Sequence, residues 1–286
     1  MKVKLVSYSQ GYNYTEGSND IRNLIAYCAK VSNPSGQMNM EKADKLLAYL
    51  IKHQHWSPFE MASACLEIET TRDIARQMLR HRSFSFQEFS QRYADPTKEL
   101  DFVSREARLQ DTKNRQNSID TDNTQLQMLW AAQQNKVITA SKEAYTWAIK
   151  NGIAKEQARA VLPEGLMSSR LLMNGTIRSW IHYIELRSGH GTQKEHMEIA
   201  RACGTAIATI FPMEKIKPMG KVMSRTESQI LDDAYCEIKL TPDSDTFYID
   251  FFVEGEKIKT EEFPGKSIHY LNSAAENWAV GIKKLN

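Results

Sequence analysis

The chain has 286 residues, of which 41% are hydrophobic and 25% are charged, and its formal net charge is only +2. This composition is ordinary for a globular protein with a substantial buried core. The low net charge argues against a uniformly basic surface for binding nucleic acid. No stretch approaches 18 apolar residues, and the first residues contain no apolar segment typical of a signal peptide. We therefore expect a cytoplasmic protein without a membrane span.

Short helices and strands are predicted along the first part of the chain. Alternating and helical patterns of apolar residues indicate a strand over 1–8, a helix from Ile21 to Cys28, a helix over 40–53, a strand over 61–70 and a helix over 71–81. Asn19 or Asp20 is a suitable N-cap for the first helix. Pro58 sets a turn before the second strand.

Long helices dominate the prediction for the next part. Residues 109–123 are polar and aperiodic, which is typical of a long surface loop. Helical patterns then cover 124–150, 167–188 and 193–211, and Gly189-His190-Gly191 ends the second of these helices.

A smaller unit is predicted at the C-terminal end. Two strand-like runs within 234–256 flank a turn-forming segment, which indicates a β-hairpin, and a helix follows over 266–284. The character of the sequence changes after Pro212, which places a boundary near 213–225.

Two domains are therefore expected, a main domain over 1–212 and an extension over 213–286 to which the sequence assigns no role. The expected fold class is α/β of the α+β type. It combines an antiparallel or mixed sheet with long helices, and the C-terminal hairpin and helix are an addition to it.

Residues 80–92 read Arg-His-Arg-Ser-Phe-Ser-Phe-Gln-Glu-Phe-Ser-Gln-Arg and suit an anionic ligand. Three arginines and three serines can donate hydrogen bonds to such a ligand: Arg80, Arg82, Arg92, Ser83, Ser85 and Ser90. A guanidinium group presents a planar fork of donors that matches a phosphate. The alternative is a solvated basic helix end whose arginines form ion pairs with Glu88 and Asp95.

The pattern Arg80-His81-Arg82-x-x-Ser85-x-x-x-x-Ser90-x-Arg92 resembles, without a mismatch, the RHRxxSxxxxSxR signature of flavin-dependent thymidylate synthases. Four further segments resemble elements of that family: His55–Glu60, Arg105–Ser118, Arg159–Pro163 and Arg178–Arg187. The resemblance covers residues 1–212.

This resemblance implies an enzyme that binds FAD and dUMP, uses methylene-tetrahydrofolate and NADPH, and forms homotetramers whose active sites lie between subunits. It implies that the following residues contact FAD: Ser57, Arg80, His81, Arg82, Glu88, Arg178 and His182, with His55 beside the flavin. It implies that the following residues contact dUMP: Gln77, Arg80, Glu88, Ser90, Arg92, Arg159 and Arg187. Thr176 and His182 stand where many or some relatives have Asn.

Arg187 is the residue to which the resemblance gives the catalytic role. A guanidinium beside the uracil ring favours its ionised, more nucleophilic form, and reduced flavin supplies the hydride. Ser90 is expected to be a ligand, because no base that could activate its hydroxyl lies beside it in the sequence. None of the four cysteines (Cys28, Cys65, Cys203 and Cys236) has a visible activating partner, so we expect reduced thiols and no cysteine nucleophile.

Helix geometry constrains the predicted helix over 167–188. Arg178 and His182 are four residues apart and share a face, whereas Arg187 lies about 140° round the helix from His182. Either the helix breaks before Arg187, or its two faces serve sites shared with different subunits.

Two other functions remain open on the sequence. His53, His55 and Glu60, or His190, Glu195 and His196, could bind zinc, although their spacing matches no zinc motif and we expect no metal. His190 and His196 would otherwise lie in a surface loop and helix. The arginines of residues 80–92, interleaved with Phe84, Phe86 and Phe89, could bind single-stranded nucleic acid, although we expect these rings to pack in the core.

Overall fold

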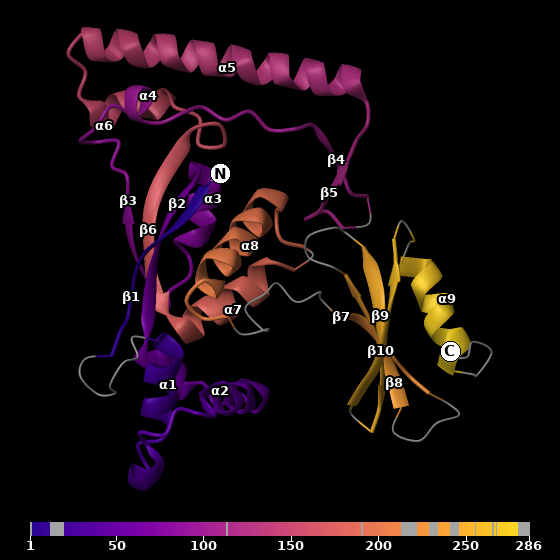
Figure 1. The fold of residues 1–286 in the computed structure, drawn as a ribbon. Helices are drawn as coiled ribbons and strands as arrows, with labels where there is room; N and C mark the ends of the chain where they lie inside the picture. The colour runs from indigo at the N-terminus through magenta and orange to yellow at the C-terminus, as the bar shows by residue number, and fades with distance from the viewer. Residues whose placement is uncertain are drawn as a thin grey trace. The chain divides into compact units, whose positions relative to one another are not determined.

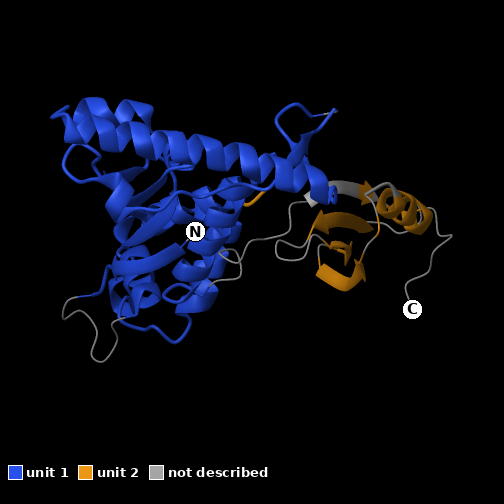
Figure 2. Ribbon diagram, turned by 90° about the horizontal axis from the view of Figure 1, so that it is seen from above, with its two compact units in different colours: residues 1–187, 191–217 blue, residues 188–190, 218–286 orange. Residues whose placement is uncertain are grey.

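The computed structural model describes residues 2–11, 20–112, 114–189, 191–212, 222–228, 234–240, 246–254, 256–264, 266 and 268–279. The chain divides into two compact units, shown in different colours in Figure 2. The first contains residues 1–187 and 191–217, and the second contains residues 188–190 and 218–286. In the described part of the chain, every helix is too short or too polar to span a membrane.

A four-stranded antiparallel sheet organises the first unit, with the strand order β1-β2-β6-β3 (Figure 1). Its strands are β1 (Lys2–Tyr8), β2 (Ser63–Thr71), β6 (Ser168–Thr176) and β3 (Phe84–Glu88). The central pair is in register from Ser63 opposite Thr176 to Thr71 opposite Ser168. Apolar residues alternate along β2, so one face of the sheet is buried.

Helices α7 (Ile177–Arg187) and α8 (Lys194–Ala208) pack on each other and against this sheet (Figure 1). Helix α1 (Ile21–Ala29) packs against both α2 (Ala43–Lys52) and the 3₁₀ helix η2 (Ser57–Met61). Asp20, one of the two N-cap candidates in the sequence, caps α1 by accepting from the backbone N–H of Arg22. Trp180, Tyr183, Phe59 and Phe211 are among the largest fully buried side chains of the core.

The predicted helix over 167–188 is wrong in its first half. Residues 168–176 form strand β6, which pairs with β2 on one side and β3 on the other. Burial alternates along this strand, with Ser169, Leu171 and Met173 buried and Arg170 and Asn174 exposed. Pairing with two distant strands overrides the local helical pattern of Leu171, Leu172 and Met173.

The predicted helix over 71–81 ends early. Helix α3 covers only Arg72–Met78, a turn follows, and Phe84–Glu88 then form β3, which the sequence did not predict. Gly175 on β6 lies opposite Phe84, and a Cβ atom added to this glycine would lie 2.4 Å from the ring. The absent side chain therefore lets the Phe84 ring enter the core beside Trp180.

Helix α5 (Thr124–Lys150) is long, as predicted, and packs against α6 (Lys155–Ala158) and the 3₁₀ helix η3 (Arg159–Val161). The segment preceding it was predicted to be an aperiodic loop. It contains a short antiparallel pair formed by β4 (Arg108–Gln110) and β5 (Ser118–Asp120). A four-residue helix, α4 (Pro96–Glu99), follows residues 80–92.

The second unit is an antiparallel sheet covered by one helix (Figure 1). Its strands, in the order β10-β9-β8-β7, are β7 (Val222–Glu227), β8 (Ala234–Leu240), β9 (Phe247–Val253) and β10 (Glu256–Phe263). Helix α9 (Ile268–Ala279) packs its Leu271 and Trp278 against Phe251 of the sheet. The predicted hairpin and helix are present, but β7 and β10 flank the hairpin.

Candidate functional site

The junction between β6 and α7 positions Arg178, one of the residues expected at the flavin. Thr176 ends the strand and Ile177 begins the helix directly, without a linker. Arg178 donates from Nη1 to Oε1 of Glu60 at 2.7 Å, and the Thr176 hydroxyl donates to Oε2 of the same carboxylate at 2.9 Å. Thr176 and Arg178 therefore hold the two oxygens of one carboxylate.

Segment 55–61 meets α7 a second time at His182. The rings of Trp56 and His182 meet edge to face with their centroids 4.6 Å apart. Arg178 and His182 thus point to the same segment, as their spacing predicted. His55 and Ser57 are exposed at the start of this segment, so a ligand can reach them.

Arg187 lies at the last position of α7, which continues unbroken from Ile177. One of the two sequence-based alternatives, a helix break before Arg187, is therefore wrong. The guanidinium donates from Nε to Nε2 of His81 at 3.0 Å, which joins α7 to residues 80–92. Burial, followed by the charge of Arg187, lowers the pKa of His81.

A buried histidine supports this contact from α8. His196 is fully buried and lies 3.1 Å from the Tyr183 hydroxyl through Nε2 and 3.1 Å from Gln77 Oε1 through Nδ1. Burial, with the charges of Arg187 and His81, lowers the pKa of His196 to about 3. We call Gln77, His81, Tyr183, Arg187 and His196 the histidine cluster.

The expectation that His196 lies on a surface helix is wrong. Its spacing of three, four and seven residues from Ile199, Ala200 and Cys203 places it on the buried stripe of α8. That spacing was visible in the sequence and could have identified His196 as a buried residue.

Arg80 and Arg82 follow α3 and are exposed. Within the described residues, neither guanidinium has a hydrogen-bond or ion-pair partner. Because α3 ends at Met78, Arg80 does not continue the helix face of Gln77. Both arginines are therefore free to meet an anion from solvent.

Glu88 is paired with cations other than those the sequence suggested. It accepts from the Ser169 hydroxyl at 2.8 Å and from Arg72 Nη1 at 3.4 Å, and Arg76 Nη1 lies 3.7 Å away. The proposed ion pairs of Glu88 with the arginines of residues 80–92 are absent among the described contacts. Burial, above all, lowers the pKa of Arg72.

Arg92 and Arg159 both contact Glu156. Arg92 Nε lies 3.4 Å from the Glu156 carboxylate, and Arg159 Nε donates to the Glu156 backbone carbonyl at 3.3 Å. Both arginines are exposed, and the Ser90 hydroxyl accepts from the backbone N–H of Arg92 at 3.4 Å. We call Arg92 and Arg159 the arginine pair.

The residues expected at the nucleotide thus fall into separate groups within one chain. Gln77 and Arg187 belong to the histidine cluster, whereas Ser90 is attached to the arginine pair. Across the described residues, no hydrogen bond or ion pair joins the histidine cluster to the arginine pair.

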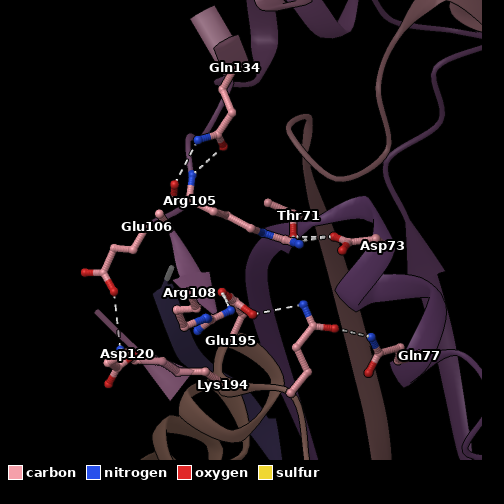
Figure 3. Close-up of polar contacts among 12 residues, drawn as sticks. Thr71, Asp73, Gln77, Arg105, Glu106, Arg108, Asp120, Gln134, Lys194 and Glu195 are labelled. Carbon is pink, nitrogen blue, oxygen red and sulfur yellow. Dashed lines mark hydrogen bonds and ion pairs between the residues drawn. The ribbon is translucent and has the colours of Figure 1, made fainter. Parts of the chain in front are cut away.

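A cavity of about 540 Å³ lies elsewhere on the first unit. It is lined by the ends of β2 and β6, by the segment 99–108 and by the first turn of α8. None of the residues expected at the flavin or the nucleotide lines it. Figure 3 shows polar contacts around it, including Arg105 with Asp73 and Arg108 with Glu195.

The packing of Phe84 and Phe86 does not favour the nucleic-acid alternative. Phe84 is buried against Trp180 and Phe86 packs at the edge of the core, so these rings are not free to stack on bases. Among the described residues, no three His, Cys, Asp or Glu side chains gather as a metal site. His190 lies outside the described residues.

Comparison with known proteins gives consistent matches. A family model described as "Thymidylate synthase complementing protein" matches residues 12–213. A "Probable flavin-dependent thymidylate synthase" of Paramecium bursaria Chlorella virus 1 is 50% identical over 212 residues, covering 74% of this chain and 96% of the viral protein. A flavin-dependent thymidylate synthase of Synechocystis sp. is 49% identical over 191 residues, covering 66% of this chain and 85% of that protein.

The fold is also found in solved structures. A UMP/dUMP methylase PolB from Streptomyces cacaoi, bound with 5-Br UMP, aligns with a TM-score of 0.61 and 24% identity. The alignment covers 75% of this chain and 91% of that chain. At this identity the likeness shows a common fold.

Proposed function

Because the chain belongs to the thymidylate synthase complementing protein family, which includes flavin-dependent thymidylate synthases, we propose that it is an FAD-dependent enzyme that methylates dUMP to dTMP. Methylene-tetrahydrofolate is the proposed carbon donor and NADPH the proposed reductant. We place the reaction in residues 1–212, because the family model matches residues 12–213. We assign no step of the reaction to residues 213–286.

The residues of the first unit fit a bound FAD. Its phosphates require exposed donors, which Arg80 and Arg82 provide, and its ring system requires a partly apolar surface with polar groups, which Trp56 and His182 provide. The proposed FAD contacts are Ser57, Arg80, His81, Arg82, Glu88, Arg178 and His182, with His55 beside the flavin. When bound and reduced, the flavin supplies the hydride that completes the methyl group.

The nucleotide would be held by guanidinium groups from separate segments. The arginine pair is exposed, and its members meet at Glu156, so two forks of donors can converge on one phosphate. Gln77, Arg80, Glu88, Ser90 and Arg187 complete the proposed set of dUMP contacts. Gln77 and Arg187 are held in the histidine cluster by His196 and His81.

Arg187 is the proposed catalytic residue. Its Nε donates a hydrogen bond to His81, so the two terminal nitrogens are the ones that would face the uracil ring. A positive charge held there favours the electron-rich form of the ring that attacks the carbon donor. No cysteine nucleophile is needed, and burial raises the pKa of the thiols of Cys28, Cys65 and Cys203, which opposes thiolate formation.

A homotetramer with active sites between subunits is part of the proposal. Helix α5 exposes large apolar side chains along its length: Met128, Leu129, Trp130, Val137 and Trp147. Such a surface is typical of a helix that packs against another copy. Sites between subunits would also bring the histidine cluster of one chain to the arginine pair of another.

The observation that carries this proposal is the hydrogen bond between Arg187 and His81, because it joins α7 to the arginine-rich segment. The test is the visible absorption spectrum of the purified chain, recorded with and without dUMP, followed by an assay of dTMP formation. We expect a flavin spectrum that dUMP perturbs. A colourless protein that binds neither added FAD nor dUMP would overturn the proposal.

A further inference from the structure

A hydrogen-bond chain runs from the histidine cluster to the rim of the cavity. Tyr183 contacts His196, His196 contacts Gln77, and Gln77 donates from Nε2 to Gln193 Oε1 at 2.8 Å. Gln193 in turn donates from Nε2 to Glu195 Oε2 at 2.9 Å, and Arg108 donates to Glu195 Oε1 at 2.5 Å. Figure 3 shows the part of this chain from Gln77 to Arg108.

The carboxylate at the end of the chain fixes the direction of every bond in it. Burial raises the pKa of Glu195, but hydrogen bonds from its own backbone N–H and from Gln193, with the charge of Arg108, lower it overall. An ionised carboxylate only accepts, so Gln193 must present its Nε2 to it. Gln193 Oε1 is then free to accept from Gln77.

The orientation of the Gln77 amide in turn determines which ring nitrogen of His196 carries the hydrogen. Gln77 uses Nε2 toward Gln193, so its Oε1 faces His196 and Nδ1 of that ring must carry the hydrogen. Nε2 of His196 is then the acceptor for the Tyr183 hydroxyl. One ionised group therefore sets two amide orientations and one tautomer.

We propose that Glu195 is a positioning residue that, through Gln193, fixes which end of the Gln77 amide acts as donor toward the bound nucleotide. This inference rests on the proposed function, which makes Gln77 a dUMP contact. One N–H and one lone pair of the Gln77 amide remain after the chain is satisfied. Their places are set before the nucleotide arrives, which reduces the cost of ordering this contact.

The substitution Glu195→Gln reverses the chain. Arg108 requires an acceptor, so the new carboxamide turns its oxygen to Arg108 and its NH₂ group to Gln193. Gln193 and Gln77 then rotate their amides, and His196 receives its hydrogen on Nε2 instead of Nδ1. The side-chain hydrogen bonds from Arg108 to Tyr183 can be kept, with the Tyr183 hydroxyl now accepting from His196 Nε2, while the donor and acceptor of Gln77 exchange places.

The substitution Arg108→Leu distinguishes the effect of hydrogen-bond direction from the effect of a less stable fold. It leaves Glu195 as an ionised acceptor with the chain direction unchanged, but it removes the partner of a carboxylate whose side chain is only 14% exposed. Arg108→Leu should therefore lower the melting temperature more than Glu195→Gln. Glu195→Gln should weaken dUMP binding more than Arg108→Leu.

A matched control is Glu106, which contacts the first turn of α8. Lys194 contacts Glu106 at 3.3 Å, and the Glu106 side chain is 71% exposed. Glu106→Gln removes an ion pair at this helix end without touching Gln193. Its dUMP affinity and the tautomer of His196 should match those of the wild type.

The experiment measures two quantities at pH 8 in the full chain loaded with FAD. One is the dissociation constant of dUMP, which should rise about tenfold in Glu195→Gln, the effect of one reversed hydrogen bond to a ligand. The other is the tautomer of His196, read from ring nitrogen shifts of histidine-labelled protein and assigned with His196→Gln. It should change from Nδ1–H to Nε2–H in Glu195→Gln alone.

Two results would overturn the inference: an unchanged His196 tautomer in Glu195→Gln, or an equal loss of dUMP affinity in Glu195→Gln and Arg108→Leu. If the wild type bound no dUMP, the proposed function would fail. The tautomer would still decide whether Glu195 orients Gln77, because that measurement needs no nucleotide.

Discussion

Arg187 and His81 lie 106 positions apart in the chain, and Nε of the arginine donates to Nε2 of the histidine. The accepting nitrogen carries no hydrogen, so the imidazole has its hydrogen on Nδ1. Burial and the neighbouring guanidinium lower the pKa of His81, which keeps the ring in this neutral form. Within the described residues, the two terminal nitrogens of Arg187 have no hydrogen-bond partner.

Arg187→Ala should retain FAD and lose most of the methylation activity. Removal of one preorganised charge from a reacting centre lowers kcat by about 10²- to 10³-fold. The measurements are the flavin content of the purified variant and the rate of dTMP formation. Arg170→Ala, at an exposed arginine of β6, is the control and should behave as the wild type. Loss of flavin together with unchanged dUMP binding would contradict the assigned role.

Arg82→Ala should weaken FAD binding by about tenfold, the usual effect of losing one charge-assisted hydrogen bond. The reason is that this exposed guanidinium has no competing partner in the described part of the chain. Flavin absorbance per protein after purification, and titration with FAD, measure the effect. Arg170→Ala again serves for comparison. Full flavin content in Arg82→Ala would count against a contact with the cofactor.

Mixing two inactive variants tests whether the site is shared between subunits. Arg187→Ala damages the histidine cluster, and Arg92→Ala damages the arginine pair. If these groups come from different chains, tetramers co-expressed from both variants should recover about a quarter of the wild-type activity, the chance that one site receives both intact halves. Each variant expressed alone is the control. Absence of any recovery, with mixed tetramers demonstrated by two affinity tags, would place both groups of one site in the same chain.

The free energy of unfolding should decrease as the pH is lowered, because His196 is buried in its neutral form. Its pKa is about 3 in the folded chain and 6.5 for an ordinary histidine, with Arg187 and His81 facing it. The unfolded chain therefore binds a proton that the folded chain does not, so the stabilisation is complete above pH 6.5 and is lost as pH falls toward 3. The slope for this one group is about 1.4 kcal/mol per pH unit.

The measurement is the free energy of unfolding in urea between pH 7.5 and 5. His196→Gln cannot titrate at this position and should show a shallower dependence on pH than the wild type. The other titrating groups are common to both proteins, so they cancel in the difference. Parallel curves for the two proteins would show that the pKa of His196 is not lowered by folding.

The spacing of apolar residues correctly predicted those helical features that depend only on residues close in sequence. The cap at Asp20, the length of α5 and the common face of Arg178 and His182 follow from neighbours within four residues, and all three are present. Strand β6 was missed because its conformation depends on pairing with β2 and β3, more than 80 residues earlier in the chain.

The motif identified the family but not the way its residues assemble. Nothing in residues 80–92 indicates that Glu88 pairs with Arg72 and Ser169, or that Arg92 meets Glu156. Glu88 meets Ser169 through the pairing of β3 with β6, and Arg92 meets Glu156 where the turn after β3 lies beside α6, so both contacts depend on the folded chain. His196 is different, because its place on the apolar stripe of α8 could have been read from spacing alone.

The absence of a linker between β6 and α7 ties the orientation of the helix to the rigidity of the sheet. Thr176 is still paired with Ser63, and the backbone N–H of Ile177 donates to Ala62 at 2.9 Å, so the first turn of the helix is anchored at its origin. One extra residue at this point would turn Arg178, His182 and Arg187 together by about 100°. Insertions that a surface loop absorbs would here misdirect three side chains at once, so this junction should tolerate a change in length poorly.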